Sequence, residues 1–110
     1  MTAVSRRDAV TFDRARLILL LSWMSSHPSV SDLDEVSTLA LDGLRSCLRS
    51  DPNAIAAGER EAVERVAFIL DVLLGTVGNC ETEERNLKSR LWLDAGASAE
   101  MAHSLLGTNR

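Results

Sequence analysis

The amino-acid sequence predicts an all-α fold: a single domain over residues 1–110, built as a compact bundle of about five helices. Apolar residues recur with helical spacing in five segments, period-2 alternation is absent, and β-branched residues never cluster. A chain of 110 residues has the usual length of one domain, and no repeat or linker indicates a second. Because 45% of the residues are hydrophobic but only 4% are aromatic, we expect Leu, Ala and Val to form most of the core.

The first predicted helix covers residues 8–24, and Ser5 followed by Asp8 is its start signal. Its apolar residues form two opposed stripes. One stripe contains Val10, Leu17, Leu20, Leu21 and Met24, and the other contains Phe12, Ala15, Leu19 and Trp23. A helix that is apolar on two sides is either central in a bundle or shared between the core and a partner.

The second predicted helix has Ser31 as its N-cap and runs to about residue 48. Its apolar residues form a single stripe, which is typical of a helix with one buried face. Gly43 flanks that stripe, and a glycine inside a helix costs about 1 kcal/mol relative to alanine. We therefore expect a neighbouring helix to approach closely at Gly43.

The third predicted helix, residues 59–74, carries a broad apolar face and an opposite charged face. Phe68 and Val72 lie in the middle of the charged face and touch, because they are four residues apart. An apolar pair on a solvated face usually indicates a second protein surface, on a copy of the chain or on a partner. We expect Gly75 to end this helix as a left-handed cap.

Two further helices are predicted in the last thirty residues. One covers residues 81–95, with three glutamates in its first turn that suit the helix dipole, and Gly96 is expected to end it. Ser98 is then expected to cap a short helix over residues 99–106, which Gly107 ends. In the longer helix, Glu84 and Lys88 form a favourable i, i+4 ion pair.

No motif in the sequence indicates a reaction, so we expect no enzyme, no metal and no cofactor. His27 and His103 lack a Cys, Asp or second His at the spacing of metal ligands. The acidic clusters lie at helix starts, and no glycine-rich phosphate loop follows a strand. Cys47 and Cys80 lie in different elements, and we expect both to be reduced thiols packed as small hydrophobic residues.

The charge and hydropathy of the chain argue against binding to nucleic acid or to a membrane. The net charge is -4, from 12 basic and 16 acidic residues, whereas non-specific binding to nucleic acid requires a basic surface. The string AGASAEMAHSLLGTNR has the form of the first half of a helix-turn-helix, but we do not expect it to be followed by a second helix that would enter the major groove. The apolar run 17–21 is too short to span a bilayer, and no signal-peptide pattern precedes it. We therefore expect a cytoplasmic protein.

Several apolar residues exceed what a lone fold of this size is expected to bury. These candidate partner or dimer-interface residues are Phe12, Leu19, Trp23, Phe68, Val72 and Trp92. Aromatic anchors in an apolar patch are the usual energetic centre of protein interfaces. The alternative is that a compact five-helix fold buries them all.

A resemblance to a known family is carried by the run FDRARLILLLSWMSSHPSVSDLDEVSTLALDGLRSCLRS, followed by EAVERVAFILDVLLG. These segments, which cover most of the chain, resemble the QslA-type antiactivators of bacterial quorum sensing. The resemblance implies a small helical homodimer whose target is a LuxR-type, acyl-homoserine-lactone-responsive transcription regulator of the LasR kind. It further implies that the chain binds the ligand-binding domain of this regulator and disrupts its dimerisation.

Other classes of binding protein share the same character. A secretion-type chaperone or a phage-derived inhibitor is also small, acidic and helical, and a truncated DNA-binding regulator is a third alternative. The resemblance includes no short motif from which functional residues of the family could be assigned to positions in this sequence. The candidate residues therefore come from the helical projections alone.

Overall fold

The computed structural model describes residues 15–50 and 56–108, in which every regular element is an α-helix. A helix at residues 15–26 is followed by α2 (Leu33–Ser50), α3 (Ala57–Leu74) and α4 (Glu81–Thr108). The all-α prediction is confirmed for these residues, although they contain four helices rather than about five. The predicted start of the first helix lies outside the described residues.

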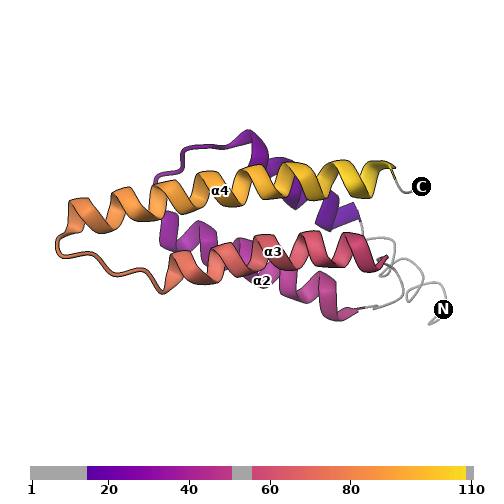
Figure 1. Ribbon diagram of the computed structural model, residues 1–110, viewed down its shortest axis with the longest axis horizontal. Helices are drawn as coiled ribbons and strands as arrows, with labels where there is room; N and C mark the ends of the chain where they lie inside the picture. The colour runs from indigo at the N-terminus through magenta and orange to yellow at the C-terminus, as the bar shows by residue number, and fades with distance from the viewer. Residues whose placement is uncertain (1–14, 51–55, 109–110) are drawn as a thin grey trace, which may run out of the picture.

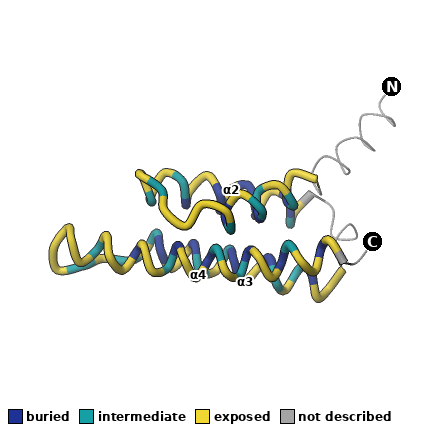
Figure 2. The backbone as a smooth tube through the Cα atoms, turned by 90° about the horizontal axis from the view of Figure 1, so that it is seen from above, coloured by how far each residue is buried: buried dark blue, intermediate teal, exposed yellow. Residues whose placement is uncertain are grey.

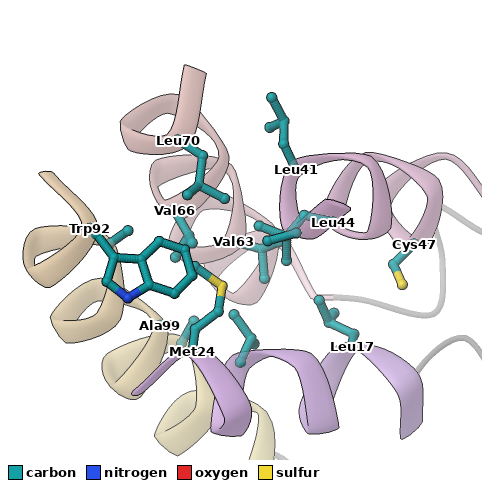
Figure 3. Close-up of a cluster of buried hydrophobic side chains, with 14 of the residues drawn as sticks. Leu17, Met24, Leu41, Leu44, Cys47, Val63, Val66, Leu70, Trp92 and Ala99 are labelled. Atoms are coloured by element: carbon teal, nitrogen blue, oxygen red, sulfur yellow. The ribbon is translucent and has the colours of Figure 1, made fainter. Parts of the chain in front are cut away.

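The four helices form a two-layer bundle. Helices α3 and α4 run antiparallel, side by side, and pack closely along their length (Figure 1). A view turned by 90° shows α2 in a separate layer from α3 and α4 (Figure 2). The helix at 15–26 lies between α4 and α2 on the side of the core away from α3 (Figure 3). The outer side of α3 and the outer side of the helix at 15–26 therefore face opposite ways.

The core lies between the layers and draws on all four helices (Figure 3). Its largest fully buried apolar side chains are Leu17, Leu21, Met24, Leu44, Val63, Val66, Leu70, Leu73, Trp92 and Leu106. Helix α4 adds a buried stripe of alanines at Ala95, Ala99 and Ala102. Small side chains there let the neighbouring helices approach α4 closely.

The start of α2 differs from the prediction by one residue. The backbone N–H of Glu35 donates to Oδ1 of Asp32 at 3.1 Å, so Asp32 is the N-cap and the prediction of Ser31 is wrong. At Gly43, an added Cβ would lie 3.0 Å from Cδ2 of Leu20 on the helix at 15–26. The close approach predicted at this glycine is therefore confirmed.

Helix α3 begins two residues before the predicted start. The backbone N–H of Ala56 donates to Oε1 of Glu59 at 3.0 Å, and Glu59 is buried. At the other end, Gly75 has φ −89°, which is a right-handed conformation, so the left-handed cap predicted there is wrong. The N–H groups of Gly75 and Thr76 instead reach the carbonyls of Asp71 and Leu73, each at 3.1 Å.

The two predicted C-terminal helices are one continuous helix, α4, of 28 residues. Gly96 does not end a helix and Ser98 does not cap one, which corrects both predictions. Gly96 is instead explained by a tertiary contact. A Cβ at Gly96 would lie 3.3 Å from the carbonyl oxygen of Met24, so the missing side chain allows the end of the helix at 15–26 to pack closely against α4. The buried alanines on either side of Gly96 continue the same packing surface.

Candidate functional site

Among the described residues, no group of three or more His, Cys, Asp or Glu side chains could hold a metal ion. In the same part of the chain, no helix is long and apolar enough to cross a membrane. Cys47 lies in the core, as predicted, whereas Cys80 is exposed at the start of α4, which corrects the prediction that it is packed as a hydrophobic residue.

The first exposed apolar surface lies on α3. Phe68 is 68% exposed and Val72 is 42% exposed, so the prediction that this pair lies in solvent is confirmed. The inward side of the helix carries Val63, Val66 and Leu70, which are fully buried. Because helical residues repeat every 3.6 positions, Phe68 and Val72 project from the side opposite the core.

An apolar groove lies on the same side, between α3 and α4. It has a volume of about 190 Å³ and is lined by Gly58, Glu61, Ala62, Arg65, Ser98, Met101 and Leu105. Phe68 shares this side of α3, because it follows Arg65 by three residues and Glu61 by seven. We call this surface the α3/α4 face, defined by Phe68, Val72, Ala62, Met101 and Leu105.

The second exposed apolar surface lies on the helix at 15–26. Leu19 is 70% exposed and Trp23 is 39% exposed, so these two residues of the second predicted stripe are partly or largely accessible to solvent. Trp23 stacks on the imidazole ring of His27, with ring centroids 4.5 Å apart, and meets the edge of Trp92 at 6.2 Å. We call Leu19 and Trp23 the Trp23 surface, and it belongs to the layer opposite the α3/α4 face.

Trp92 is a core residue, which corrects its placement among the candidate interface residues. It is only 1% exposed, and its Nε1–H donates to the carbonyl oxygen of His27 at 2.7 Å. Trp92 lies on the same stripe of α4 as the buried Ala95 and Ala99, which faces the core. Phe12, the remaining candidate, lies outside the described residues.

A polar cleft of about 490 Å³ lies between the start of α2 and the first turns of α4. On its wall, the buried Nζ of Lys88 donates to Oδ1 of Asp34 at 2.8 Å and to Oε2 of Glu84 at 3.3 Å. The pair with Glu84 was predicted from the i, i+4 spacing, but the pair with Asp34 was not. The hydrogen bond that Lys88 donates to the Asp34 carboxylate raises the pKa of Lys88 above its ordinary value of 10.5. We interpret this cluster as a link between α2 and α4 rather than a ligand site, because the buried Lys88 ammonium is paired with a carboxylate from each helix.

The Lys88 cluster predicts a pH dependence of stability. A lysine whose pKa is higher in the folded state stabilises the fold fully below its unfolded pKa, and this stabilisation is lost as the pH rises through the folded pKa. Lys88→Met should lower the free energy of unfolding by about 1–2 kcal/mol at neutral pH. The deficit should shrink above pH 10.5, when the wild type loses the same charge. Urea unfolding of the wild type and Lys88→Met, from neutral pH to above pH 10.5, measures this difference in unfolding free energy.

Arg90→Met is the matched control for Lys88→Met, because Arg90 is an exposed cation on the same helix. It should change the unfolding free energy little at any pH. An equal loss of stability in both variants would show that the Lys88 contacts contribute nothing specific.

Comparison with known proteins gives no assignment for this chain. No protein-family model, curated protein or solved structure matches it.

Proposed function

We propose that the chain is a protein-binding antiactivator that sequesters a LuxR-type quorum-sensing transcription regulator. The observation that supports the binding role best is the presence of two exposed apolar surfaces on opposite layers, each with an aromatic side chain. The choice of target comes from the resemblance to QslA-type antiactivators. In this proposal the protein acts by binding alone, with no catalysed reaction and no cofactor.

The proposed mechanism is competitive masking. An apolar surface of this chain would cover the surface with which the regulator pairs with itself, and the regulator would then remain without its dimer partner. Such masking requires only that the affinity for the regulator exceed the self-association of the regulator. Phe68 with Val72, or Trp23 with Leu19, would supply the contact, because buried aromatic anchors dominate the binding energy of protein interfaces.

Two separate surfaces suit a protein that binds a copy of itself and a partner at once. Phe68 projects from α3, and Trp23 projects from the helix that lies across the core from it (Figure 3). A partner on one surface would therefore leave the other accessible. This arrangement supports the proposal of a homodimer that also holds the regulator.

Capture of the ligand-binding domain of a LuxR-type regulator on immobilised protein tests the proposal. Trp23→Ala, Phe68→Ala or both should weaken capture at least about tenfold, because loss of one interface anchor costs about 2 kcal/mol. Val77→Ala is the control, since Val77 is 82% exposed but lies in the connection before α4, outside both surfaces. If the double variant keeps its circular dichroism and binds as tightly as the wild type, the apolar surfaces are not the contact.

A further inference from the structure

We infer that the exposed side of the helix at 15–26 and α2 is a docking surface for a basic, amphipathic helix of a partner protein. The inference rests on the proposed role in protein binding and deepens it, because it extends the Trp23 surface onto α2 and states which side chains the partner presents. We call this surface the hairpin surface, defined by Leu19, Trp23 and Leu39, with Glu35 and Asp42 at its border.

The helix at 15–26 and α2 are antiparallel neighbours. Only residues 27–32 connect them, and a short connection places consecutive helices side by side in opposite directions. They also pack closely, because a Cβ at Gly43 of α2 would lie 3.0 Å from Cδ2 of Leu20. From this contact toward the connection, one helical turn leads to Trp23 on the first helix and to Leu39 on α2.

Three large apolar side chains are exposed on the outer side of this helix pair. Leu19 is 70% exposed, Trp23 is 39% exposed and Leu39 is 65% exposed. Trp23 follows Leu20 by three residues and Leu39 precedes Gly43 by four, so both lie beside the line along which the two helices meet. The exposed apolar surface of the first helix is therefore continued on α2.

Trp23 is held in place before a partner binds. Its ring stacks on the imidazole ring of His27, with centroids 4.5 Å apart, and meets the ring of Trp92 edge-to-face at 6.2 Å. The Nδ1–H of His27 donates to the carbonyl oxygen of Trp23 at 2.8 Å, because a carbonyl oxygen can only accept. An aromatic side chain that is already fixed loses little conformational entropy on binding, which favours Trp23 as an interface anchor.

The charges beside the apolar side chains on α2 are negative. Glu35 and Asp42 are exposed and lie one turn before and one turn after Leu39. Neither forms a salt bridge within the described part of the chain, whereas Asp34 is the carboxylate that pairs with Lys88. Residues 17–44 contain no lysine or arginine. A partner with cations on either side of an apolar residue therefore complements this surface.

The cations of the two helices lie away from this part of the surface. Arg45 is directed toward α3, where its guanidinium lies 3.6 Å from the carboxylate of Asp71. Arg16 and Arg49 lie near the opposite end of the helix pair, away from the connection. Asp32, the N-cap of α2, adds a carboxylate at the end near the connection. The end that carries Trp23 and Leu39 is thus acidic.

A basic amphipathic helix matches these features. Its apolar side chains would cover Leu19 and Leu39, and lysine or arginine one turn to either side would pair with Glu35 and Asp42. An arginine of the partner can also stack on Trp23, because tryptophan is the aromatic side chain that attracts a cation most strongly. The partner is therefore recognised by its apolar side chains and by its positive charge together.

Fluorescence anisotropy of a labelled synthetic peptide, titrated with the full chain, tests the inference. The probe is an amphipathic helix of about five turns, with a seam of leucines flanked by arginines. The comparison peptide has glutamate in place of each arginine. The arginine peptide should bind with a dissociation constant of about 10–100 μM, and the glutamate peptide should bind at least about thirtyfold more weakly.

Variants of the chain place the contact on the hairpin surface. Leu39→Ala and the double variant Glu35→Lys/Asp42→Lys should each weaken binding of the arginine peptide about tenfold. The double variant should also bind the glutamate peptide more tightly than the wild type does. Glu61→Lys/Glu64→Lys is the matched control, because it changes the net charge equally but on the exposed side of α3. It should change either affinity by less than about threefold, and circular dichroism checks that every variant is folded.

Three results would overturn the inference. The first is an arginine peptide that binds no more tightly than the glutamate peptide. The second is binding that Leu39→Ala and Glu35→Lys/Asp42→Lys weaken no more than the matched control does. The third is a wild type that sediments as a dimer and that Leu39→Ala dissociates, because a second copy would then cover the hairpin surface.

Capture of the ligand-binding domain of a LuxR-type regulator separates this inference from the proposed function. Capture that is lost in Phe68→Ala but kept in Leu39→Ala would overturn the inference and leave the proposed function standing. A chain that binds the arginine peptide through Leu39 but captures no regulator would support the inference and contradict the proposed function.

Discussion

Replacing Trp92 by alanine should destabilise the protein by about 3–5 kcal/mol, which is the usual cost of removing a buried aromatic side chain. Trp92 is 1% exposed and packs among side chains of the helix at 15–26, α3 and α4 (Figure 3). Its removal leaves a cavity and also leaves the carbonyl oxygen of His27 without the Nε1–H donor at 2.7 Å. Since domains of this size are stable by about 5–15 kcal/mol, the loss should be evident in urea unfolding followed by circular dichroism.

Trp92→Phe separates the two contributions to that loss. The phenyl ring refills most of the cavity but cannot donate a hydrogen bond to His27, so we expect a loss of about 1–2 kcal/mol. If Trp92→Ala lowered the free energy of unfolding by less than about 1 kcal/mol, the burial of Trp92 would be contradicted and the side chain would have to be exposed.

The second large effect is expected at Gly78, in the connection between α3 and α4. A Cβ at Gly78 would lie 2.5 Å from the backbone nitrogen of Glu84 and 2.8 Å from its Cα. Backbone atoms of a helix cannot rotate away, so Gly78→Ala must displace the connection from the first turn of α4. We expect a loss of about 3 kcal/mol, as for an overpacked site, measured as a lower midpoint of urea unfolding.

Gly75→Ala is the matched control in the same connection. Gly75 has φ −89°, and a Cβ there would come no closer than 3.6 Å to any atom outside its neighbours. Alanine should therefore be neutral or should stabilise the fold by up to about 1 kcal/mol, because it restricts the unfolded chain. Equal unfolding midpoints for the two variants would contradict the close approach at Gly78.

The sequence was sufficient for the all-α class and for the buried and exposed sides of the third helix. The third helix is the clearest case: charged residues at helical spacing mark its solvent side, and Phe68 and Val72 lie among them and are exposed. On the helix at 15–26 the two apolar stripes left open whether Leu19 and Trp23 are buried, and the structure leaves Leu19 70% and Trp23 39% exposed.

The errors arose where tertiary contacts override local sequence. A glycine that ends a helix and a glycine that allows a neighbouring helix to approach cannot be distinguished from the local sequence alone. The sequence therefore predicts a helix end at Gly96, whereas Gly96 packs against Met24, more than seventy residues away. Trp92 is likewise held by residues distant in the sequence, since its ring meets Trp23 and its Nε1–H donates to the carbonyl oxygen of His27. The ion pair of Lys88 with Asp34 joins residues 54 positions apart, and no local spacing predicts it.

Sedimentation velocity of a LuxR-type ligand-binding domain, alone and mixed with this chain, tests the central claim most directly. The proposed masking predicts that the regulator domain sediments as a dimer alone, and that the dimer is replaced by a complex of regulator protomers with this chain as the chain is added. A regulator that stays dimeric at every ratio, while this chain sediments separately, would contradict the account.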